Sequence, residues 1–332
     1  MRVTVEIPRL RALIVARLGQ VFGRAQAEQM ADAVLFGELV GRSTHGIIRV
    51  LPGRKGAVDE EPGPTPTIRR TAPAAASIEG RPGMLVASMA TDLAIELAIE
   101  HGFAVVTTRG SRSTSGSLTY YIDRLTSADL VGLVTANTLS FVTPPGGLAR
   151  TLGTNPMGIG IPADPYPFIM DMATSATTFG DVVEARDSDA SIPPGVAVDA
   201  GGRPTRDPVA VLEGGALLTF GGHKGLGLSM AVELLSGAIA GSDAGDVGPD
   251  DVWGHVFVAF SLGMIGDPEQ VKARAQGVID RIAATPTVDG VAPRIPGHRS
   301  LMARDRALAS GVVEVDRASF DELVDLVGTG SP

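Results

Sequence analysis

Short apolar runs alternate along this chain with segments of helical periodicity, and this alternation constrains the fold more than any other feature. Phe103–Thr107 and Val131–Thr135 are short apolar strands, and the segment Tyr120–Leu125 between them is helical in pattern. Met157–Pro162 and Phe168–Met172 predict two further strands, joined by a proline-rich turn. Strands that alternate with helices are typical of α/β or α+β proteins.

Apolar residues at helical spacing predict several helices. These cover Pro8–Gly23, Ala25–Val40, Thr91–His101, Leu226–Ala240, Pro268–Ala284 and Phe320–Val327. The first two form a helical hairpin, and Leu226–Ala240 is apolar almost all round, which is typical of a buried helix. Val211–Phe220 is expected to hold a short helix and a strand, and Val256–Phe260 a strand. The Pro/Gly-rich segment Pro52–Pro73 predicts a connector without a regular element.

Composition excludes several classes of protein. The net charge of −9 and the absence of a Lys/Arg cluster argue against binding to nucleic acid. The chain has no cysteine, which excludes a disulfide scaffold, a zinc–thiolate site and a thiol nucleophile, and fits a cytoplasmic protein. We expect no signal peptide, because the N-terminus lacks an apolar segment, and no membrane span, because no apolar run reaches roughly 18 residues.

A histidine and an arginine stand four residues apart in GRSTHGIIR, just past the second helix. If this turn is helical, His45 and Arg49 share one face. Together they can hold a carboxylate, Arg49 by a bidentate pair and His45 by a single donor. The alternative is that His45 caps the helix and Arg49 pairs with an acid on the surface.

A second cationic pair, His223-Lys224, lies in TFGGHKGLGLS near a predicted helix N-terminus. The helix dipole disfavours a lysine there by roughly 0.3–1 kcal/mol. A phosphate or carboxylate bound to the exposed N–H groups would offset that cost. The alternative is that Lys224 reaches a surface acid.

Two further motifs carry weaker signals. The segment DMATS, Asp171–Ser175, follows a strand, where its acid and hydroxyls can hold an amide or a ribose, or can cap a helix through Asp171, Thr174 or Ser175. LGTNPMGIGIPA is a turn, with Asn155-Pro156, that enters a strand. A Rossmann phosphate loop, a P-loop, HExxH, GxSxG and a His/carboxylate cluster with metal-ligand spacing are all absent. His255 precedes a strand and is interpreted as structural.

Taken in order, the motifs GRSTHGIIR, GTNPMGIGIP, DMATS and GGHKGLGL resemble those of the malate/L-lactate dehydrogenase family, which includes sulfolactate dehydrogenases and cyclic ketimine reductases. The resemblance also covers IPPGVAVDAGGRPTRDP and runs from about Leu10 to Arg299. It implies a homodimer that uses NAD or NADP without a Rossmann fold. The implied fold is a mixed, largely antiparallel sheet with an N-terminal helical part. We accordingly expect three parts: residues 1–75, the cofactor-binding core 76–230, and the completing helices and strand of 231–332.

The resemblance also implies site residues. His45 and Arg49 match positions that hold a substrate carboxylate. Cofactor contacts are implied for the following residues: Asn155, Asp171, Met172, Ala173, Thr174, His223, Lys224, Gly225 and, in the late turn IPGHR, Gly297.

One departure from the family pattern concerns the acid. The family carries a catalytic histidine in a segment of the type SNHFG, and this chain reads RGSRSTSGSLTYY there. Counting back from Tyr120-Tyr121 puts Thr114, or Ser113, at the histidine position. A positioned acid contributes about 10²–10⁴-fold to such a reaction, and a hydroxyl with an ordinary pKa can act only as a relay.

Two functions therefore stay open. The first is an NAD(P)H-dependent oxidoreductase for a small keto or imino substrate with a carboxylate, in which an iminium needs little acid or His45 serves as the acid. The second is an altered homologue with a non-redox or binding role.

Overall fold

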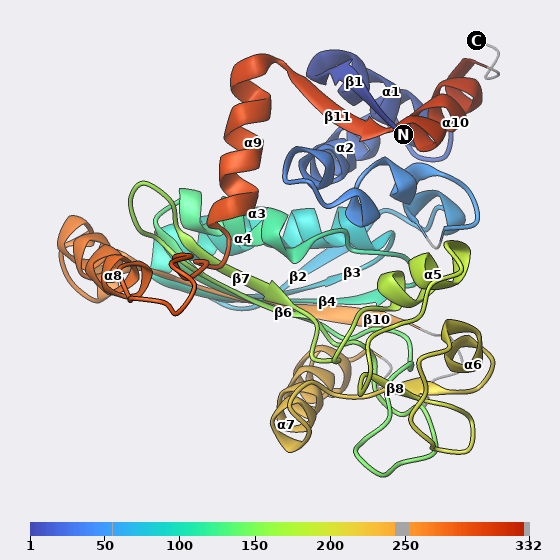
Figure 1. Cartoon of the computed structure of the whole chain (residues 1–332). Coiled ribbons are helices and arrows are strands. Elements are labelled where there is room, and N and C mark those ends of the chain that lie inside the picture. The colour runs from blue at the N-terminus through green and yellow to red at the C-terminus, as the bar shows by residue number, and fades with distance from the viewer. Residues whose placement is uncertain (55, 243–251, 329–332) are drawn as a thin grey trace.

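The computed structural model describes residues 1–54, 56–242 and 252–328 (Figure 1). Its centre is a seven-stranded sheet of order β2-β3-β4-β10-β5-β6-β7. The strands are β2 (Thr67–Ala72), β3 (Ala75–Glu79), β4 (Phe103–Ser111), β5 (Leu130–Ala136), β6 (Met157–Ile161), β7 (Phe168–Met172) and β10 (Trp253–Ser261). Only β3 and β4 pair in parallel, and the other neighbours are antiparallel. The predicted mixed, largely antiparallel sheet is confirmed.

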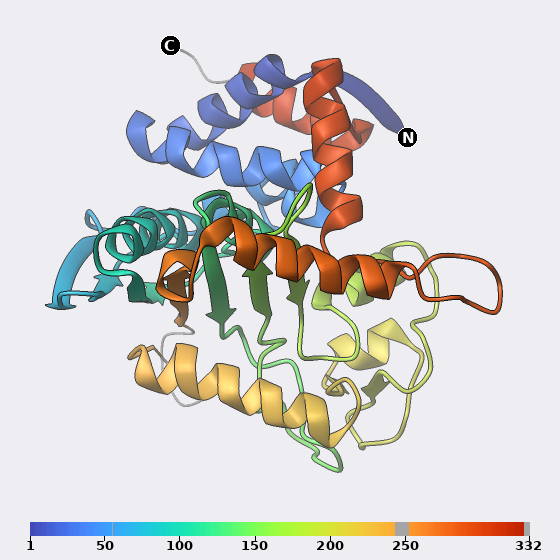
Figure 2. The same cartoon turned by 90° about the vertical axis from the view of Figure 1, so that its left-hand side faces the viewer.

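Helices cover both faces of the sheet, with α3 and α4 on one face and α7 on the other (Figures 1 and 2). The helices are α1 (Ile7–Gly19), α2 (Arg24–Leu39), α3 (Gly83–His101), α4 (Leu118–Ser127), α5 (Phe179–Asp187), α6 (Pro208–Leu212), α7 (His223–Val232), α8 (Pro268–Ala283), α9 (His298–Ser310) and α10 (Arg317–Gly328). Two small ladders complete the structure: β1 (Arg2–Glu6) with β11 (Val312–Asp316), and β8 (Ala197–Val198) with β9 (Ala216–Leu217).

Two large apolar cores stack above one another. The central core joins α3 and α4 to the sheet through residues such as Leu97, Val106, Tyr121 and Phe257. A second core lies in the helical layer above it, where α1 and α2 pack against β11 and α10. A third, smaller core lies around the β8–β9 ladder.

The central sheet contains strands from all three predicted parts of the chain. Its strand β2 comes from residues 1–75 and its strand β10 from residues 231–332, and the other strands lie mainly between them. The last part also includes 243–251 and 329–332, which lie outside the described residues.

Two sequence-based expectations about where elements lie were wrong. Pro52–Pro73 contains β2, an exposed edge strand, so no alternation of buried and exposed residues marks it. The third helix begins at Gly83 and not at Thr91, because its first turns are buried on nearly every side and show no 3.6-residue period. The ladder β1–β11 and the helix α9 were not predicted.

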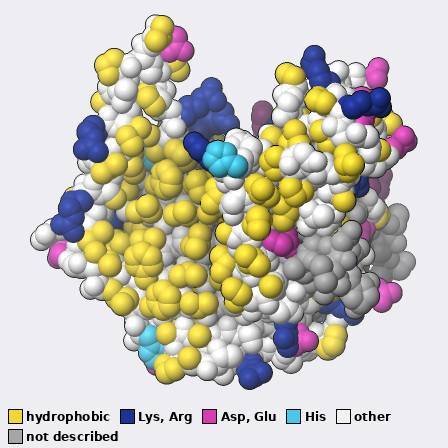
Figure 3. Space-filling view, turned by 90° about the horizontal axis from the view of Figure 1, so that it is seen from below, with side chains coloured by type: hydrophobic (Ala, Val, Ile, Leu, Met, Phe, Trp, Pro, Cys, Tyr) yellow, Lys and Arg dark blue, Asp and Glu magenta, His cyan; other side chains and the backbone are white. Residues whose placement is uncertain are grey.

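The helix predicted over Leu226–Ala240 starts earlier, at His223, and its last turns are a π-helical segment, η4 (Glu233–Ile239). The prediction that this helix is buried all round is wrong. Four large apolar side chains lie on its outer face, Leu228, Met230, Leu234 and Ile239, with exposed fractions of 37%, 49%, 56% and 70%. Figure 3 shows apolar side chains gathered on this underside of the molecule.

No helix in the described part of the chain is both long and apolar enough to span a membrane.

Candidate active site

The loop after α2 carries His45 in two short 3-10 turns, η1 (Ser43–His45) and η2 (Ile47–Val50), separated by Gly46. The turn is thus not one continuous helix, so the condition for His45 and Arg49 to share a single helical face is not met, although the two side chains still interact electrostatically. Burial lowers the pKa of His45 to about 4, and the charge of Arg49 adds to this while Asp171 opposes it. His45 is thus neutral at pH 7, which weakens the hypothesis that it serves as an acid with an ordinary pKa.

The ring of His45 meets one hydroxyl, Thr44 Oγ1, which lies 3.0 Å from Nδ1. Among the described residues, Nε2 has no hydrogen-bond partner. The ring therefore keeps one nitrogen available for a ligand.

Among the described residues, Arg49 is held by backbone carbonyls and not by an acid. Its Nε donates to Thr44 O at 2.6 Å and its Nη1 to Arg54 O at 3.0 Å. Burial lowers the pKa of Arg49. Within the described ranges the other terminal nitrogen, Nη2, is unpaired, so one donor is left for an anion.

Asp171, at the end of β7, is the centre of a buried network. Its Oδ2 accepts hydrogen bonds from Arg42 Nη1 (2.7 Å), Ser117 Oγ (3.1 Å), Thr119 N (3.0 Å) and Thr119 Oγ1 (2.7 Å). The side chain is only 8% exposed. These contacts join the His45 loop to the segment that precedes α4. Sequence reasoning missed Arg42, although it lies within the same GRSTHG motif.

The loop where the family's histidine is expected turns its first hydroxyl inward. Ser113 is 2% exposed, and its Oγ accepts a hydrogen bond from Gly83 N at 3.2 Å. Its carbonyl accepts one from Trp253 Nε1 at 2.9 Å. Thr114 Oγ1 accepts one from Gly116 N at 3.1 Å, which closes its own turn. Ser113 therefore offers no exposed hydroxyl, while Thr114 is partly exposed. The catalytic position implied for either residue stays a prediction.

His255 lies beneath this loop. The side chain is fully buried in β10, with Thr108 Oγ1 2.6 Å from Nδ1 and with Ser115 Oγ hydrogen-bonded to Nε2. Burial lowers its pKa to about 4. Its interpretation as a structural residue missed the contact with Ser115, which comes from a loop 140 residues earlier in the chain.

Of the other residues implied to contact a cofactor near Asp171, two are buried and two are partly exposed. Asn155 is buried at a positive φ of 40°, and its Nδ2 donates to Glu233 Oε2 at 2.7 Å. Thr174 is also buried, with its Oγ1 donating to Thr154 O and Asn155 O, both at 3.1 Å. Met172 and Ala173, between Asp171 and Thr174, are partly exposed.

His223 and Lys224 open α7, with exposed side chains. In the described structure Lys224 forms no ion pair, which leaves the predicted alternative of a surface acid without support. Gly225 is required by packing, because an added Cβ would lie 2.2 Å from Phe220 O. This helix start lies across the sheet from the His45 loop (Figure 1), so one chain does not bring the two cationic pairs together.

Gly297 precedes α9 at a φ of 87°. An added Cβ there would meet Ile169 of β7 at 2.9 Å, so the turn packs directly on the strand that leads to Asp171. Its predicted contact with a cofactor stays a prediction.

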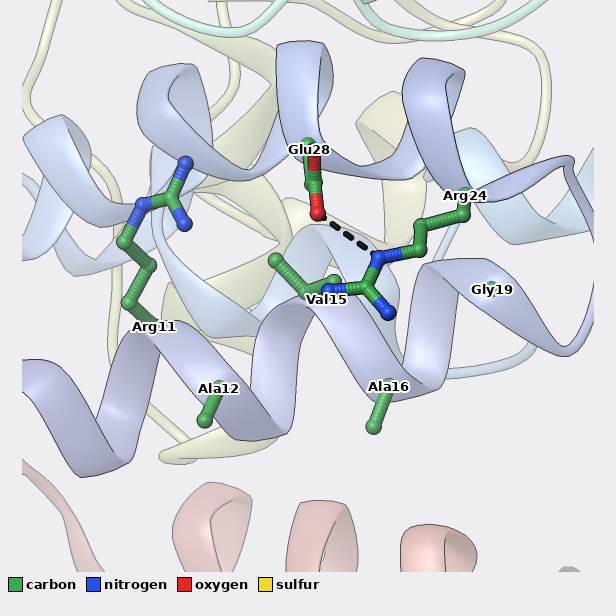
Figure 4. Close-up of a pocket in the computed structure, with 7 residues that line it drawn as sticks. All are labelled: Arg11, Ala12, Val15, Ala16, Gly19, Arg24 and Glu28. Carbon is green, nitrogen blue, oxygen red and sulfur yellow. Dashed lines mark hydrogen bonds and ion pairs between the residues drawn. The ribbon is translucent and has the colours of Figure 1, made fainter.

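Neither a surface groove in the helical layer nor a metal cluster marks the site in the described part of the chain. The groove, about 520 Å³, lies between α1 and α2, and none of the predicted site residues lines it (Figure 4). A cluster of three or more His, Asp or Glu side chains that could hold a metal ion is absent from the residues the structure describes.

Comparison with known proteins gives consistent matches over nearly the whole chain. A model of the family described as malate/L-lactate dehydrogenase matches residues 5–324. The L-sulfolactate dehydrogenase of Methanothermobacter thermautotrophicus is 35% identical over 309 residues, which cover 90% of this chain and 88% of that protein. A Delta(1)-pyrroline-2-carboxylate reductase of Burkholderia ambifaria is 34% identical, with 91% of each chain covered. The solved delta1-piperideine-2-carboxylate reductase of Pseudomonas syringae pvar. tomato superposes with a TM-score of 0.85 at 28% identity and covers 98% of this chain and 99% of that one.

Proposed function

The chain belongs to the malate/L-lactate dehydrogenase family, and on that premise we propose that it is an oxidoreductase using NAD or NADP. Its substrate would be a small molecule with a carboxylate next to a keto or imino group. The match over residues 5–324 carries this proposal. The sulfolactate dehydrogenase and the pyrroline-2-carboxylate reductase point in the same direction, since both names describe redox chemistry on small carboxylates.

Two parts of the structure support binding of the anions involved. Around His45, the Nε2 of the ring and the free terminal nitrogen of Arg49 offer donors to a carboxylate. At the start of α7, the exposed Lys224 and the helix N–H groups suit a phosphate of the cofactor. The nicotinamide, when bound, supplies or accepts the hydride. The protein residues hold the substrate and exclude water from it.

Of the two substrate classes, we propose that the imino class is favoured over the keto class. Reduction of a keto group places negative charge on oxygen, and the loop at 113–117 has no histidine to protonate it. An iminium arrives protonated and becomes a neutral amine. The competing candidate is a homologue that binds these ligands without redox chemistry, and the missing histidine is the observation that favours it.

Fluorescence titration with NADH and NADPH, followed by turnover assays, tests the proposal. We expect one cofactor to bind and Lys224→Ala to weaken it. Oxidation of that cofactor should be faster with pyrroline- or piperideine-2-carboxylate than with pyruvate or oxaloacetate. Arg49→Lys should raise KM for the substrate several-fold, because a lysine cannot copy the planar guanidinium. Binding without turnover on either panel would favour the non-redox role, and failure to bind either cofactor at millimolar concentration would refute both.

We also propose a homodimer that buries the outer face of α7 and η4. Contiguous exposed apolar side chains of this kind mark an interaction surface. Light scattering on a sizing column should give twice the 34.1 kDa of one chain. Leu234→Asp should shift the protein toward the monomer, whereas Leu308→Asp, at a comparably exposed position on the distant α9, should not. A monomer in the wild type would contradict this assembly.

A further inference from the structure

Three polar side chains form a chain of hydrogen bonds that runs from the sheet to the site loop. Thr108 lies on β4 and His255 on β10, and both are 0% exposed. Ser115, in the loop that follows β4, is partly exposed and contacts the outer nitrogen of His255. The chain therefore has a buried end at Thr108 and an accessible end at Ser115.

The buried end sets the direction of the hydrogen bonds. A neutral imidazole has one donor nitrogen and one acceptor nitrogen, and the low pKa of His255 keeps it neutral. The hydroxyl hydrogen of Thr108 has no other acceptor among the described residues, and leaving a buried donor unsatisfied costs free energy. Thr108 therefore donates to Nδ1, which places the ring proton on Nε2. That proton is donated to Ser115 Oγ, so the hydroxyl hydrogen of Ser115 points away from His255.

Ser115 also lies close in sequence to the hydrogen-bond network of Asp171. Two residues later, Ser117 donates to Asp171, which is paired with Arg42. The backbone of Ser115 is fixed from the other side, because the buried Tyr121 donates its hydroxyl to the Ser115 carbonyl at 2.5 Å. The hydroxyl is thus held in place and polarised by the bonds behind it.

We propose that Ser115 is a catalytic residue that donates a hydrogen bond to the reacting oxygen or nitrogen of the substrate, and that His255 is the positioning residue that turns its hydroxyl toward that atom. This inference rests on the proposed oxidoreductase function. Hydride adds to the substrate carbon, and the electron pair of the double bond moves to the neighbouring atom. On an iminium this pair becomes the lone pair of a neutral amine, which Ser115 stabilises. On a keto group it becomes an alkoxide, which finally takes its proton from water.

A set of four variants separates this role from a structural one. On a keto substrate, Ser115→Ala should lower kcat by about 100-fold, the effect of removing one donor aimed at a developing negative charge. On an iminium, which becomes neutral, the loss should be smaller. The Kd for the reduced cofactor should not change. His255→Gln keeps an N–H group near the position of Nε2, so the donor to Ser115 is kept. Its kcat should stay within about tenfold of wild type, a smaller loss than that expected when a donor is removed. His255→Asn keeps only the Nδ1 side and should fall as far as Ser115→Ala. Thr108→Val reports the effect of disturbing the buried end alone, and thermal melting of all four measures folding.

Equal losses of kcat in His255→Gln and His255→Asn, in step with their melting temperatures, would overturn the proposal in favour of packing. So would a Ser115→Ala enzyme within about threefold of wild type on a keto substrate, given the much larger effect expected of a lost donor there. Nitrogen-15 NMR of the histidine rings gives a readout that needs no turnover. A proton on Nε2 of His255, identified by its absence from the His255→Gln spectrum, supports the inference, and a proton on Nδ1 refutes it. An inactive wild type with the expected ring proton would count against the proposed function, and with it the catalytic role of Ser115, but not against the orientation that His255 gives to the Ser115 hydroxyl.

Discussion

Asp171→Ala is expected to destabilise the protein by roughly 3 kcal/mol, because removing one partner of a buried ion pair leaves the other charge uncompensated. Arg42 loses its carboxylate, and Ser117 and Thr119 lose their acceptor at the same time. The estimate takes the low end of the usual range, since the side chain of Arg42 is 36% exposed and regains some water. The loops that carry His45 and Ser115 are both hydrogen-bonded to this carboxylate. We therefore expect kcat/KM to fall even at a temperature where the variant is fully folded.

Urea unfolding of the two proteins measures the first effect, and kcat/KM at a temperature where both are folded measures the second. Glu79→Ala is a matched control, since Glu79 pairs with Arg109 at the surface with 60% of its side chain exposed. Exposed pairs contribute at most about 1 kcal/mol. A loss no larger than that of the control would show that Asp171 is replaceable by water.

Glu38→Gln is expected to stabilise the protein at pH 8 and to leave it unchanged near pH 5. Glu38 is 5% exposed at the end of α2, and its Oε1 accepts a hydrogen bond from Ile47 N at 2.8 Å. Burial raises the pKa of this carboxyl from 4.5 to about 7, although the bond from Ile47 opposes the shift. The carboxyl therefore carries a charge at pH 8 that the fold disfavours.

The sign follows from proton binding. Between pH 4.5 and 7 the folded protein keeps the proton of Glu38 while the unfolded chain releases it, so stability falls as pH rises through this window. At about 1.4 kcal/mol per pKa unit, the loss above pH 7 amounts to roughly 3 kcal/mol. The buried histidines contribute with the opposite sign, since their lowered pKa values weaken the fold as pH falls below 6.5.

Because of these opposing contributions, the difference between wild type and Glu38→Gln is the quantity to measure, by urea unfolding from pH 5 to pH 8. Glu28→Gln, on the exposed surface of the same helix, should give a difference that stays nearly constant. A constant difference for Glu38→Gln as well would show that its pKa is ordinary in the folded protein.

The strands with apolar runs could be predicted because their side chains enter the core. Phe168–Met172 was predicted with its observed bounds, and Phe103–Thr107 and Val131–Thr135 lie within the longer β4 and β5. The edge strand β2 and the first turns of α3 could not, since uniform exposure and uniform burial both remove the periodicity on which such predictions depend.

At the candidate site, local motifs pointed to His45 and Asp171 but not to the contacts that connect their segments. Arg42 and Asp171 are 129 residues apart, and Thr108 and His255 are 147 residues apart. Their contacts depend on strand pairing and loop packing between distant segments, which spacing within a motif does not encode. The register that sets Thr108 opposite His255 is fixed by the whole of β4 and β10.

The pairing of β1 with β11 has a consequence for synthesis on the ribosome. The helical layer packs Leu10 and Ile14 near the start of the chain against Val315 and Phe320 near its end. The hairpin α1–α2 is synthesised long before the side chains of β11 and α10 that cover its apolar face. Until then these residues lack their native partners, and a nascent chain with such exposed surface is prone to aggregate. Truncation before β11 should therefore yield a chaperone client and not a smaller version of the enzyme.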